Sequence, residues 1–537
     1  MKCNQCEQTA ANDSCTNIGV CGKTDNVSHL QDVLIYALRR LAHAALSARA
    51  KGIIVPEIDF FTVQALFITL TNVNFDPNVI ERFIEQAIIN RKTFAQLRGC
   101  KIDNSTRPIE EVKSMMSMPT GIDDFHKDKN NCSAMQMLLY GLKGTSAYAY
   151  HAAVLGKDDP NLYEFIYEGL AAGFPDREGN IDKERTLSDW MDLVLRCGKS
   201  NLRAMELLES GNVESFGVPT STKVSLGQKK GKAILVSGHD LKDLYDLLCQ
   251  TEGTGINIYT HGEMLPAHGY PKLHAFTHLV GHYGTAWQNQ HKEISLFPGP
   301  VLFTTNCIQN PKEYIENVFT SGVTGWPGVQ HCKDGDYSKL IERAKELPGF
   351  SEDVPGKELL TGFGKQSLLD AAPVILDSIK SGVLQHIFLV GGCDGAKPGR
   401  NYYSEFVEKA PDNTVVLTLG CGKFRFFDKD LGMIGSLPRL IDMGQCNDAY
   451  AALQVVTALA EILDCGVNDL PVSLVLSWYE QKAVSILLTL LAAGVKGIRL
   501  GPSLPSFVSE DILQLLVKEW GIAPITTPDK DIALLMQ

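Results

Sequence analysis

The chain has 537 residues, with 62 acidic and 50 basic side chains and a formal net charge of −12 at pH 7. This length predicts about three domains, and 44% hydrophobic with 21% charged residues is typical of a globular protein. The acidic balance argues against non-specific nucleic-acid binding, which needs clustered positive charge. The most apolar stretch, residues 483–495, is too short to span a membrane.

The first part of the chain is predicted to be helical. Apolar residues recur there with the period of an α-helix, and strand patterns are almost absent. Helices are predicted over residues 27–50, 61–70, 77–97, 133–155 and 187–208. Such a succession packs most simply as one helical bundle or a pair of bundles. We therefore predict a helical domain over residues 1–224.

After a polar linker near residue 217, the pattern changes to short apolar runs that alternate with helical segments. This alternation is typical of βαβ units and a parallel sheet. Strands are predicted over residues 233–237, 256–260, 301–305, 387–390, 414–419, 440–443, 472–477 and 497–500. A Pro/Gly-rich passage over residues 347–364 divides them into two series. We predict one α/β domain over residues 225–362 and another over residues 363–537.

A group of four cysteines opens the chain. It consists of Cys3, Cys6, Cys15 and Cys21. Four thiols within the first 21 residues, unevenly spaced and interleaved with glycine, suit a loop that wraps an iron–sulfur cluster. All-cysteine zinc sites are the alternative, but they usually contain two CxxC pairs and only one is present. The spacing favours iron.

Seven further potential ligands lie just beyond predicted strands. They are His239, Glu263, Cys307, Cys393, Cys421, Cys446 and Glu480. Ligands in open α/β sheets bind beyond the carboxyl ends of the strands, so these side chains are expected to converge. Zinc prefers sulfur and nitrogen, and calcium prefers oxygen, whereas an iron cluster with sulfide and oxygen bridges suits the whole mixture. The residues alone do not rank His239 above His261, His268 or His278.

The cysteines also bear on the cellular compartment and on other cofactors. Fourteen cysteines in a long chain without a secretory apolar segment favour thiolate ligands in a reducing cytoplasm over disulfides. No P-loop and no GxSxG elbow is present, and the turn at residues 391–395 lacks the GxGxxG spacing of dinucleotide sites. A nicotinamide or flavin is therefore not expected.

Taken together, these motifs resemble the hybrid-cluster protein family, also called prismane proteins or hydroxylamine reductases. The N-terminal cysteine spacing is similar to the family's short-spaced form. The other matching motifs are His-Gly-Glu-Met at Glu263, Thr-Thr-Asn-Cys at Cys307, Gly-Gly-Cys-Asp-Gly at Cys393, Leu-Gly-Cys-Gly at Cys421, Gln-Cys-Asn-Asp at Cys446 and Trp-Tyr-Glu-Gln-Lys at Glu480. The resemblance covers essentially the whole chain.

The resemblance implies a fold and two cofactors. The fold would be a helical domain followed by two Rossmann-like α/β domains, similar to carbon monoxide dehydrogenase. The N-terminal cysteines would hold a [4Fe-4S] cluster. The seven-residue set would hold a hybrid [4Fe-2O-2S] cluster between domains, with Cys393 as the persulfide. Lys482 matches the family's lysine beside that cluster.

The resemblance also implies an activity, the reduction of hydroxylamine to ammonia and water. An electron-donor protein would supply electrons through the N-terminal cluster, and Glu263, Glu480, Lys482 or His239 would handle protons. Nitric oxide reduction or protein S-nitrosylation with the same cluster is one alternative, and a non-catalytic redox carrier is another. A carbon monoxide dehydrogenase is disfavoured, because cysteines for its inter-subunit cluster have no counterpart here.

Overall fold

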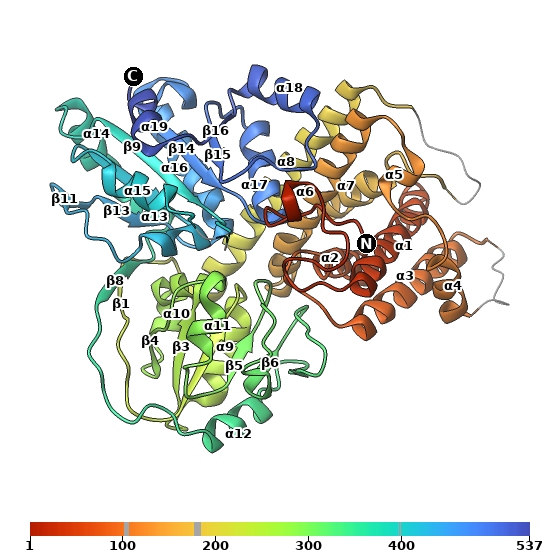
Figure 1. Cartoon of the computed structure of the whole chain (residues 1–537), viewed down its shortest axis with the longest axis horizontal. Helices are drawn as coiled ribbons and strands as arrows, with labels where there is room; N and C mark the ends of the chain where they lie inside the picture. The colour runs from red at the N-terminus through yellow and green to blue at the C-terminus, as the bar shows by residue number, and fades with distance from the viewer. Residues whose placement is uncertain (101–106, 177–183, 396, 398) are drawn as a thin grey trace.

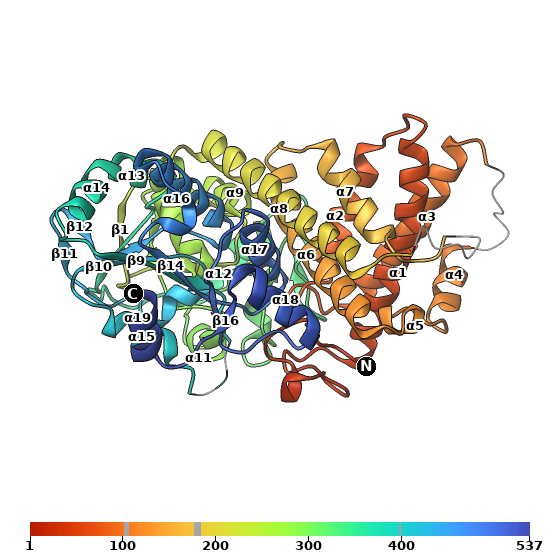
Figure 2. The same cartoon turned by 90° about the horizontal axis from the view of Figure 1, so that it is seen from above.

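The computed structural model describes residues 1–100, 107–176, 184–395, 397 and 399–537 of the chain. A helical part comes first in the chain, and two α/β parts follow it (Figure 1). Seen from above, the long helices α6 and α8 of the helical part lie next to α17 of the second α/β part (Figure 2). The predicted fold class, helices followed by parallel-sheet α/β units, is confirmed.

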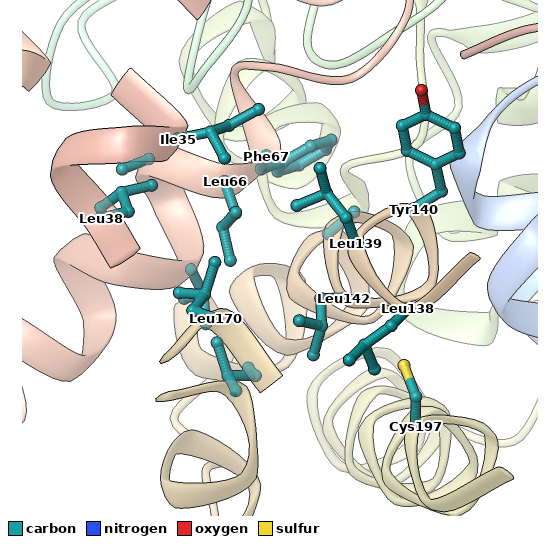
Figure 3. Close-up of a cluster of buried hydrophobic side chains, with 14 of the residues drawn as sticks. Ile35, Leu38, Leu66, Phe67, Leu138, Leu139, Tyr140, Leu142, Leu170 and Cys197 are labelled. Atoms are coloured by element: carbon teal, nitrogen blue, oxygen red, sulfur yellow. The ribbon is translucent and has the colours of Figure 1, made fainter. Parts of the chain in front are cut away.

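The helical part buries one large apolar core. Its helices are α1 (Asp25–Arg49), α2 (Pro56–Phe67), α3 (Pro77–Leu97), α4 (Pro108–Met115), α5 (Ile122–Phe125), α6 (Lys129–Val154), α7 (Pro160–Ala171) and α8 (Leu187–Phe216). Leu38 of α1, Leu66 of α2 and Leu142 of α6 belong to this core (Figure 3). Helix α6 is buried on all sides over most of its length, so it forms the centre of the part.

The first α/β part is built on a six-stranded parallel sheet with the order β4-β3-β2-β5-β6-β7. Its strands are β2 (Ala233–Ser237), β3 (Asn257–His261), β4 (Leu279–His282), β5 (Val301–Phe303), β6 (Val318–Thr320) and β7 (Gln330–His331). Its helices are α9 (Leu241–Thr251), α10 (Pro271–His274), α11 (Gln290–Ile294) and α12 (Ser338–Glu346). Ser237 pairs with both His261 and Phe303, so β2, β3 and β5 end at one level.

The second α/β part has a six-stranded parallel sheet with the order β13-β10-β9-β14-β15-β16. Its strands are β9 (His386–Gly392), β10 (Thr414–Thr418), β13 (Leu440–Asp442), β14 (Val472–Ser477), β15 (Arg499–Gly501) and β16 (Ala523–Pro524). Its helices are α13 (Lys365–Asp370), α14 (Ala372–Lys380), α15 (Tyr402–Lys409), α16 (Ala449–Leu463), α17 (Gln481–Ala492), α18 (Glu510–Trp520) and α19 (Pro528–Leu535). Two short antiparallel pairs complete the α/β parts: β1 (Thr222–Ser225) with β8 (Glu358–Thr361), and β11 (Met433–Ile434) with β12 (Leu437–Pro438).

Two glycines let α17 lie directly on the helical part. A Cβ on Gly144 of α6 would lie 2.4 Å from the carbonyl oxygen of Gln481, and one on Gly198 of α8 would lie 2.1 Å from that of Leu488. Only glycine permits this approach of backbone to backbone. The start of α17 is therefore fixed against the helices.

The predicted strands are all present, although their ends differ by a few residues. Strands β1, β4, β6, β7, β8, β11, β12 and β16 were not predicted, because short strands show little apolar pattern. Helices α4, α5 and α7 were not predicted either. In the part of the chain that the structure describes, no helix is long and apolar enough to cross a membrane. The domain boundaries stay a prediction.

Candidate metal centre

The seven predicted ligands lie at the carboxyl ends of strands from both parallel sheets, and all seven are buried. Three follow the first sheet: His239 after β2, Glu263 after β3 and Cys307 after β5. Four follow the second sheet: Cys393 after β9, Cys421 after β10, Cys446 after β13 and Glu480 after β14. The parallel registers bring these strand ends together, as expected for an open α/β sheet.

The imidazole and one carboxylate form the most compact part of the site. Ligand atoms of His239, Glu263 and Cys446 all lie within 4.8 Å of one another. His239 Nε2 is 3.1 Å from Glu263 Oε2, which also accepts the backbone N–H of Cys446 at 2.9 Å. The other ring nitrogen, Nδ1, lies 2.9 Å from Thr305 Oγ1. This second contact fixes the orientation of the ring, as is usual for metal-binding histidines.

Burial sets the charge of this pair. Burial, with the nearby Lys482 ammonium, lowers the pKa of His239 to about 4, so the ring is neutral at pH 7. Burial acts to raise the pKa of Glu263, but the contact with His239 outweighs it and lowers that pKa to about 2. A neutral imidazole beside an ionised carboxylate is the form in which both side chains bind metals.

Three thiols meet at a second point of the site. Cys307, Cys393 and Cys421 belong to one buried cluster, and the neighbouring thiols of Cys307 and Cys393 raise the pKa of Cys421. Gly392 (φ +109°) precedes Cys393, and a Cβ on it would lie 2.0 Å from the carbonyl oxygen of Ser477. Cys307 itself has φ +78°, a left-handed conformation that is rare outside glycine. The backbone thus adopts left-handed conformations beside these sulfurs, and the one at Cys307 is strained.

Glu480 and Lys482 open helix α17. Glu480 caps the helix, and its Oε2 accepts the backbone N–H of Lys482 at 2.9 Å. The Lys482 side chain is buried, and its Nζ lies 2.9 Å from Asn306 Oδ1 and 3.0 Å from His239 Nε2. Burial opposes its charge, yet the Cys446 thiol and the Glu480 carboxyl beside it raise the pKa of Lys482. Lys482 is therefore a buried cation in the middle of the ligand set.

The donor atoms of the seven residues suit an iron cluster. Within the described residues, Glu263 Oε1 and Glu480 Oε1 are buried and have no hydrogen-bond partner. Leaving a buried carboxylate oxygen unpartnered is costly unless it binds a metal. All four thiols of the set are free. The residues therefore fit a cluster that takes thiolate, imidazole and carboxylate ligands together.

The N-terminal cysteines form a second group. The backbones of Cys3 and Cys15 exchange two hydrogen bonds, of 3.1 and 2.8 Å, which closes the loop between them. Burial and the nearby thiols of Cys21 and Cys3 raise the pKa of Cys6. Lys23 Nζ lies 3.8 Å from Cys3 Sγ, so a buried cation accompanies the group. All four thiols are free, which suits a four-thiolate cluster.

An aromatic pair lies between the two ligand groups. Trp287 and Tyr479 stack with their ring centroids 4.1 Å apart, in one buried cluster with Cys307, Cys393 and Cys421. The backbone carbonyl of Tyr479 accepts the N–H of Glu7, the residue after Cys6, at 2.9 Å. The sequence reasoning did not single out this pair. Tyr479 stands beside Glu480 in the motif, but Trp287 gives no local signal.

The other candidate imidazoles are engaged elsewhere. The ring of His261 contacts Ser237 (2.9 Å) and Glu293 (3.4 Å). The rings of His268 and His278 contact the hydroxyls of Thr260 and Thr251, respectively. Thr305 and Asn306, which contact His239 and Lys482, were not predicted, although both stand in the Thr-Thr-Asn-Cys motif.

A cavity of about 720 Å³ adjoins the centre. Its lining includes the buried residues Cys393 and Cys446 and the exposed residues Lys496 and Gln537. Much of the remaining lining is aliphatic and comes from β14, α16 and α17. A largely apolar cavity therefore adjoins two of the buried cysteines.

The fold combines a helical part with two parallel-sheet parts and carries two groups of potential cluster ligands, one of them fully buried. These features indicate an iron–sulfur oxidoreductase. The Prismane/CO dehydrogenase family matches residues 1–533, and the chain belongs to this family. A hydroxylamine reductase of Solidesulfovibrio magneticus is 54% identical over 544 residues, with 100% of both chains covered. One from Methanocella arvoryzae is 52% identical over 549 residues, again with 100% of both covered.

Solved structures show the same fold at greater distance. Carbon monoxide dehydrogenase IV of Carboxydothermus hydrogenoformans aligns with a TM-score of 0.56 and 17% identity, covering 97% of this chain and 89% of that one. The carbon monoxide dehydrogenase of Thermococcus sp. AM4 aligns with a TM-score of 0.54. At this identity the likeness establishes the fold alone. Family membership implies iron–sulfur clusters, in agreement with the two ligand groups.

Proposed function

We propose that the protein reduces hydroxylamine to ammonia and water, consuming two electrons and two protons for each N–O bond broken. The cysteines Cys3, Cys6, Cys15 and Cys21 would hold a [4Fe-4S] cluster. The residues His239, Glu263, Cys307, Cys393, Cys421, Cys446 and Glu480 would hold a hybrid [4Fe-2O-2S] cluster, with Cys393 as the persulfide. The observation that carries the proposal is this buried, mixed donor set with its two unpartnered carboxylate oxygens. Full-length relatives named hydroxylamine reductase support it.

When bound, the hybrid cluster supplies electrons and Lewis-acidic iron for a substrate nitrogen or oxygen. The protein's part is to fix the ligands and to manage protons. Thr305 holds the His239 ring in one orientation through Nδ1, so that Nε2 faces the other ligands. Glu263 Oε2 is fixed by the N–H of Cys446, which leaves Oε1 available.

Lys482 is the best-placed proton source. Its ammonium is held by Asn306 Oδ1, and its raised pKa keeps the proton on Nζ at neutral pH. Proton transfer from a positioned side chain typically contributes a factor of about 10²–10⁴ to a rate. Such a donor suits a reaction whose products gain two protons.

Electrons would come from a donor protein and enter on the side of the N-terminal cysteines. Tyr479 and Trp287 fill the space between the two ligand groups, and the Glu7–Tyr479 hydrogen bond fixes their spacing. A buried and directly packed connection of this kind favours the N-terminal group as the entry point. This connection supports the proposal that electrons pass from the N-terminal cluster to the hybrid cluster.

Nitric oxide is a second candidate substrate, either for reduction or for protein S-nitrosylation. The largely aliphatic cavity of about 720 Å³ whose lining includes Cys393 and Cys446 favours it, because a small molecule with weak hydrogen bonds loses little on entering an apolar cavity. The same centre would serve both substrates. Product analysis separates them.

The test starts from protein purified without oxygen. About eight iron atoms per chain, with fewer sulfides than irons, are expected for the two proposed clusters. Reduced protein is then given hydroxylamine or nitric oxide, and ammonia and nitrous oxide are measured. Ammonia formed in step with hydroxylamine loss supports the proposal. Reversible reduction without turnover of either substrate would instead indicate a redox carrier.

A further inference from the structure

Two buried side chains outside the set of seven proposed ligands donate hydrogen bonds to ligand sulfurs. The first is Tyr148 of α6, whose hydroxyl donates to Cys446 Sγ at 3.3 Å. Tyr148 is 1% exposed, so solvent does not compete for this contact. A residue of the helical part therefore contacts a ligand that follows strand β13 of the second sheet.

The packing of α6 on α17 fixes the position of Tyr148. Gly144 lies about one turn before Tyr148, and a Cβ on Gly144 would be 2.4 Å from the carbonyl oxygen of Gln481. The two helices are thus in direct backbone contact about one turn away from the phenol. The fold itself therefore holds the Tyr148 hydroxyl beside Cys446.

The second donor is Asn306, which precedes Cys307 in the Thr-Thr-Asn-Cys motif. Its Oδ1 accepts a hydrogen bond from Lys482 Nζ at 2.9 Å, and its Nδ2 lies 3.5 Å from Cys307 Sγ. An ammonium can only donate, so Lys482 requires the amide oxygen on its side and turns the NH₂ group toward the sulfur. The buried lysine thereby fixes the direction of the Asn306 hydrogen bond.

Two more donors lie among the thiols. Within the described residues, Trp287 Nε1 and the Tyr479 hydroxyl are buried and have no hydrogen-bond partner. Both rings belong to the buried cluster that contains Cys307, Cys393 and Cys421. An unpaired buried donor is costly, so both groups are available to a sulfur atom at this centre.

Hydrogen bonds to sulfur bear on how easily an iron–sulfur centre is reduced. The reduction potential of such a centre depends on its charge, its solvent exposure and the hydrogen bonds to its sulfurs. An added electron increases the negative charge on the sulfurs, and hydrogen bonds to a more negative acceptor are stronger. Donors beside the thiolates therefore favour the reduced state.

We propose that Tyr148 and Asn306 raise the reduction potential of the seven-ligand centre by donating hydrogen bonds to the thiolates of Cys446 and Cys307. Both act through ligand sulfurs, so they are positioning residues. The inference rests on the hybrid cluster proposed above and adds two residues that control when it accepts electrons. It also gives helix α6 of the helical part a direct influence on the chemistry of the α/β parts.

The test is a redox titration, monitored by EPR, of the full-length, iron-loaded protein and its Tyr148→Phe variant. Phenylalanine keeps the ring and removes only the hydroxyl. The ratio of reduced to oxidised seven-ligand centre at a given potential should fall about tenfold, a downward shift of about 59 mV for a one-electron step. The N-terminal cluster, which has other ligands, should keep its potential and serves as the internal reference. The iron content should stay unchanged.

Two further variants make the test specific. Tyr150→Phe is the matched control, because Tyr150 is buried on the same helix but stacks on Phe60, and this variant should keep the wild-type potential. Asn306→Asp keeps an oxygen for Lys482 and replaces the NH₂ donor by a second oxygen. The potential of the seven-ligand centre should fall in this variant too, which keeps the test decisive if Tyr148→Phe does not fold.

Unchanged potentials of the seven-ligand centre in Tyr148→Phe and Asn306→Asp would overturn this inference and leave the proposed cluster intact. An equal shift in Tyr150→Phe would overturn it as well, since any lost buried hydroxyl would then have the same effect. Loss of iron without a shift in potential would show a purely structural role and would also overturn it. Wild-type protein with about four irons and a single EPR signal would refute the hybrid cluster itself.

Discussion

Replacing Gly198 by alanine is expected to disturb both stability and the metal centre. The added Cβ would lie 2.1 Å from the carbonyl oxygen and 2.5 Å from the carbonyl carbon of Leu488. These are backbone atoms, so α17 as a whole must move away from α8. Overpacking costs about 1–3 kcal/mol, and the better helix propensity of alanine returns about 1 kcal/mol. A net loss of up to about 2 kcal/mol in unfolding free energy follows.

The same movement displaces the first turn of α17, which carries Glu480 and Lys482. A shift of about 1 Å in a reacting group can cost a factor of about 10² in rate. Hydroxylamine turnover should therefore fall further than the stability change alone predicts. Denaturant unfolding and ammonia release, measured on the same preparation, would show both effects.

Gly169→Ala in α7 is the matched control. Its Cβ would meet Leu142 Cδ1 at 2.8 Å, which is the end of a flexible side chain that can rotate away. This variant is expected to stay within about 1 kcal/mol of the wild type and to keep its turnover. If Gly198→Ala proved as stable and as active as Gly169→Ala, the backbone contact would not position α17 and the reasoning would be wrong.

Three further changes test other parts of the molecule. Lys482→Met should lower ammonia production by about 10²–10⁴-fold while iron content stays unchanged, and full activity would remove Lys482 as the proton source. Cys6→Ser should remove the N-terminal cluster and about half of the iron, whereas Cys197→Ser, at a buried thiol of the helical core, should leave the iron count unchanged. Burial, with the Asp240 carboxylate nearby, raises the pKa of Asp243 to about 7, so its contribution to stability is present below about pH 4 and is lost as pH rises towards 7. Asp243→Asn should flatten this pH dependence in thermal unfolding from pH 4 to 8, and an unchanged slope would contradict the shifted pKa.

Local patterns predicted the elements that carry the site. Strands such as β2 and β10 are buried throughout, have an apolar centre and are followed within two residues by glycine, so a single sequence reveals them. Strand β7 has two exposed polar residues, Gln330 and His331, and exists only because β6 pairs with it. Its formation depends on tertiary contacts that no local pattern encodes.

The sequence placed the seven proposed ligands just beyond strand ends, where the structure has them, but it did not reveal the long-range contacts around them. His239 and His261 both stand at the end of an apolar strand, so the residues alone did not separate them. The position of each residue in the sheet separates them. His261 is the last residue of β3 and contacts Ser237, whereas His239 lies beyond the end of β2. Trp287 reaches the centre only by stacking on Tyr479 from another part of the chain.

The seven proposed ligands are divided between two sheets, so they lie together only while the two α/β parts are docked. Three ligands come from one sheet and four from the other, so neither part holds the full set. The sequence separation between His239 and Glu480 gives the site a high contact order, and ordering it early would cost much loop-closure entropy. The N-terminal cysteines close a short local loop instead. If the two α/β parts separated, the seven residues would therefore no longer lie together. The four N-terminal cysteines would stay close to one another, because they belong to one short loop.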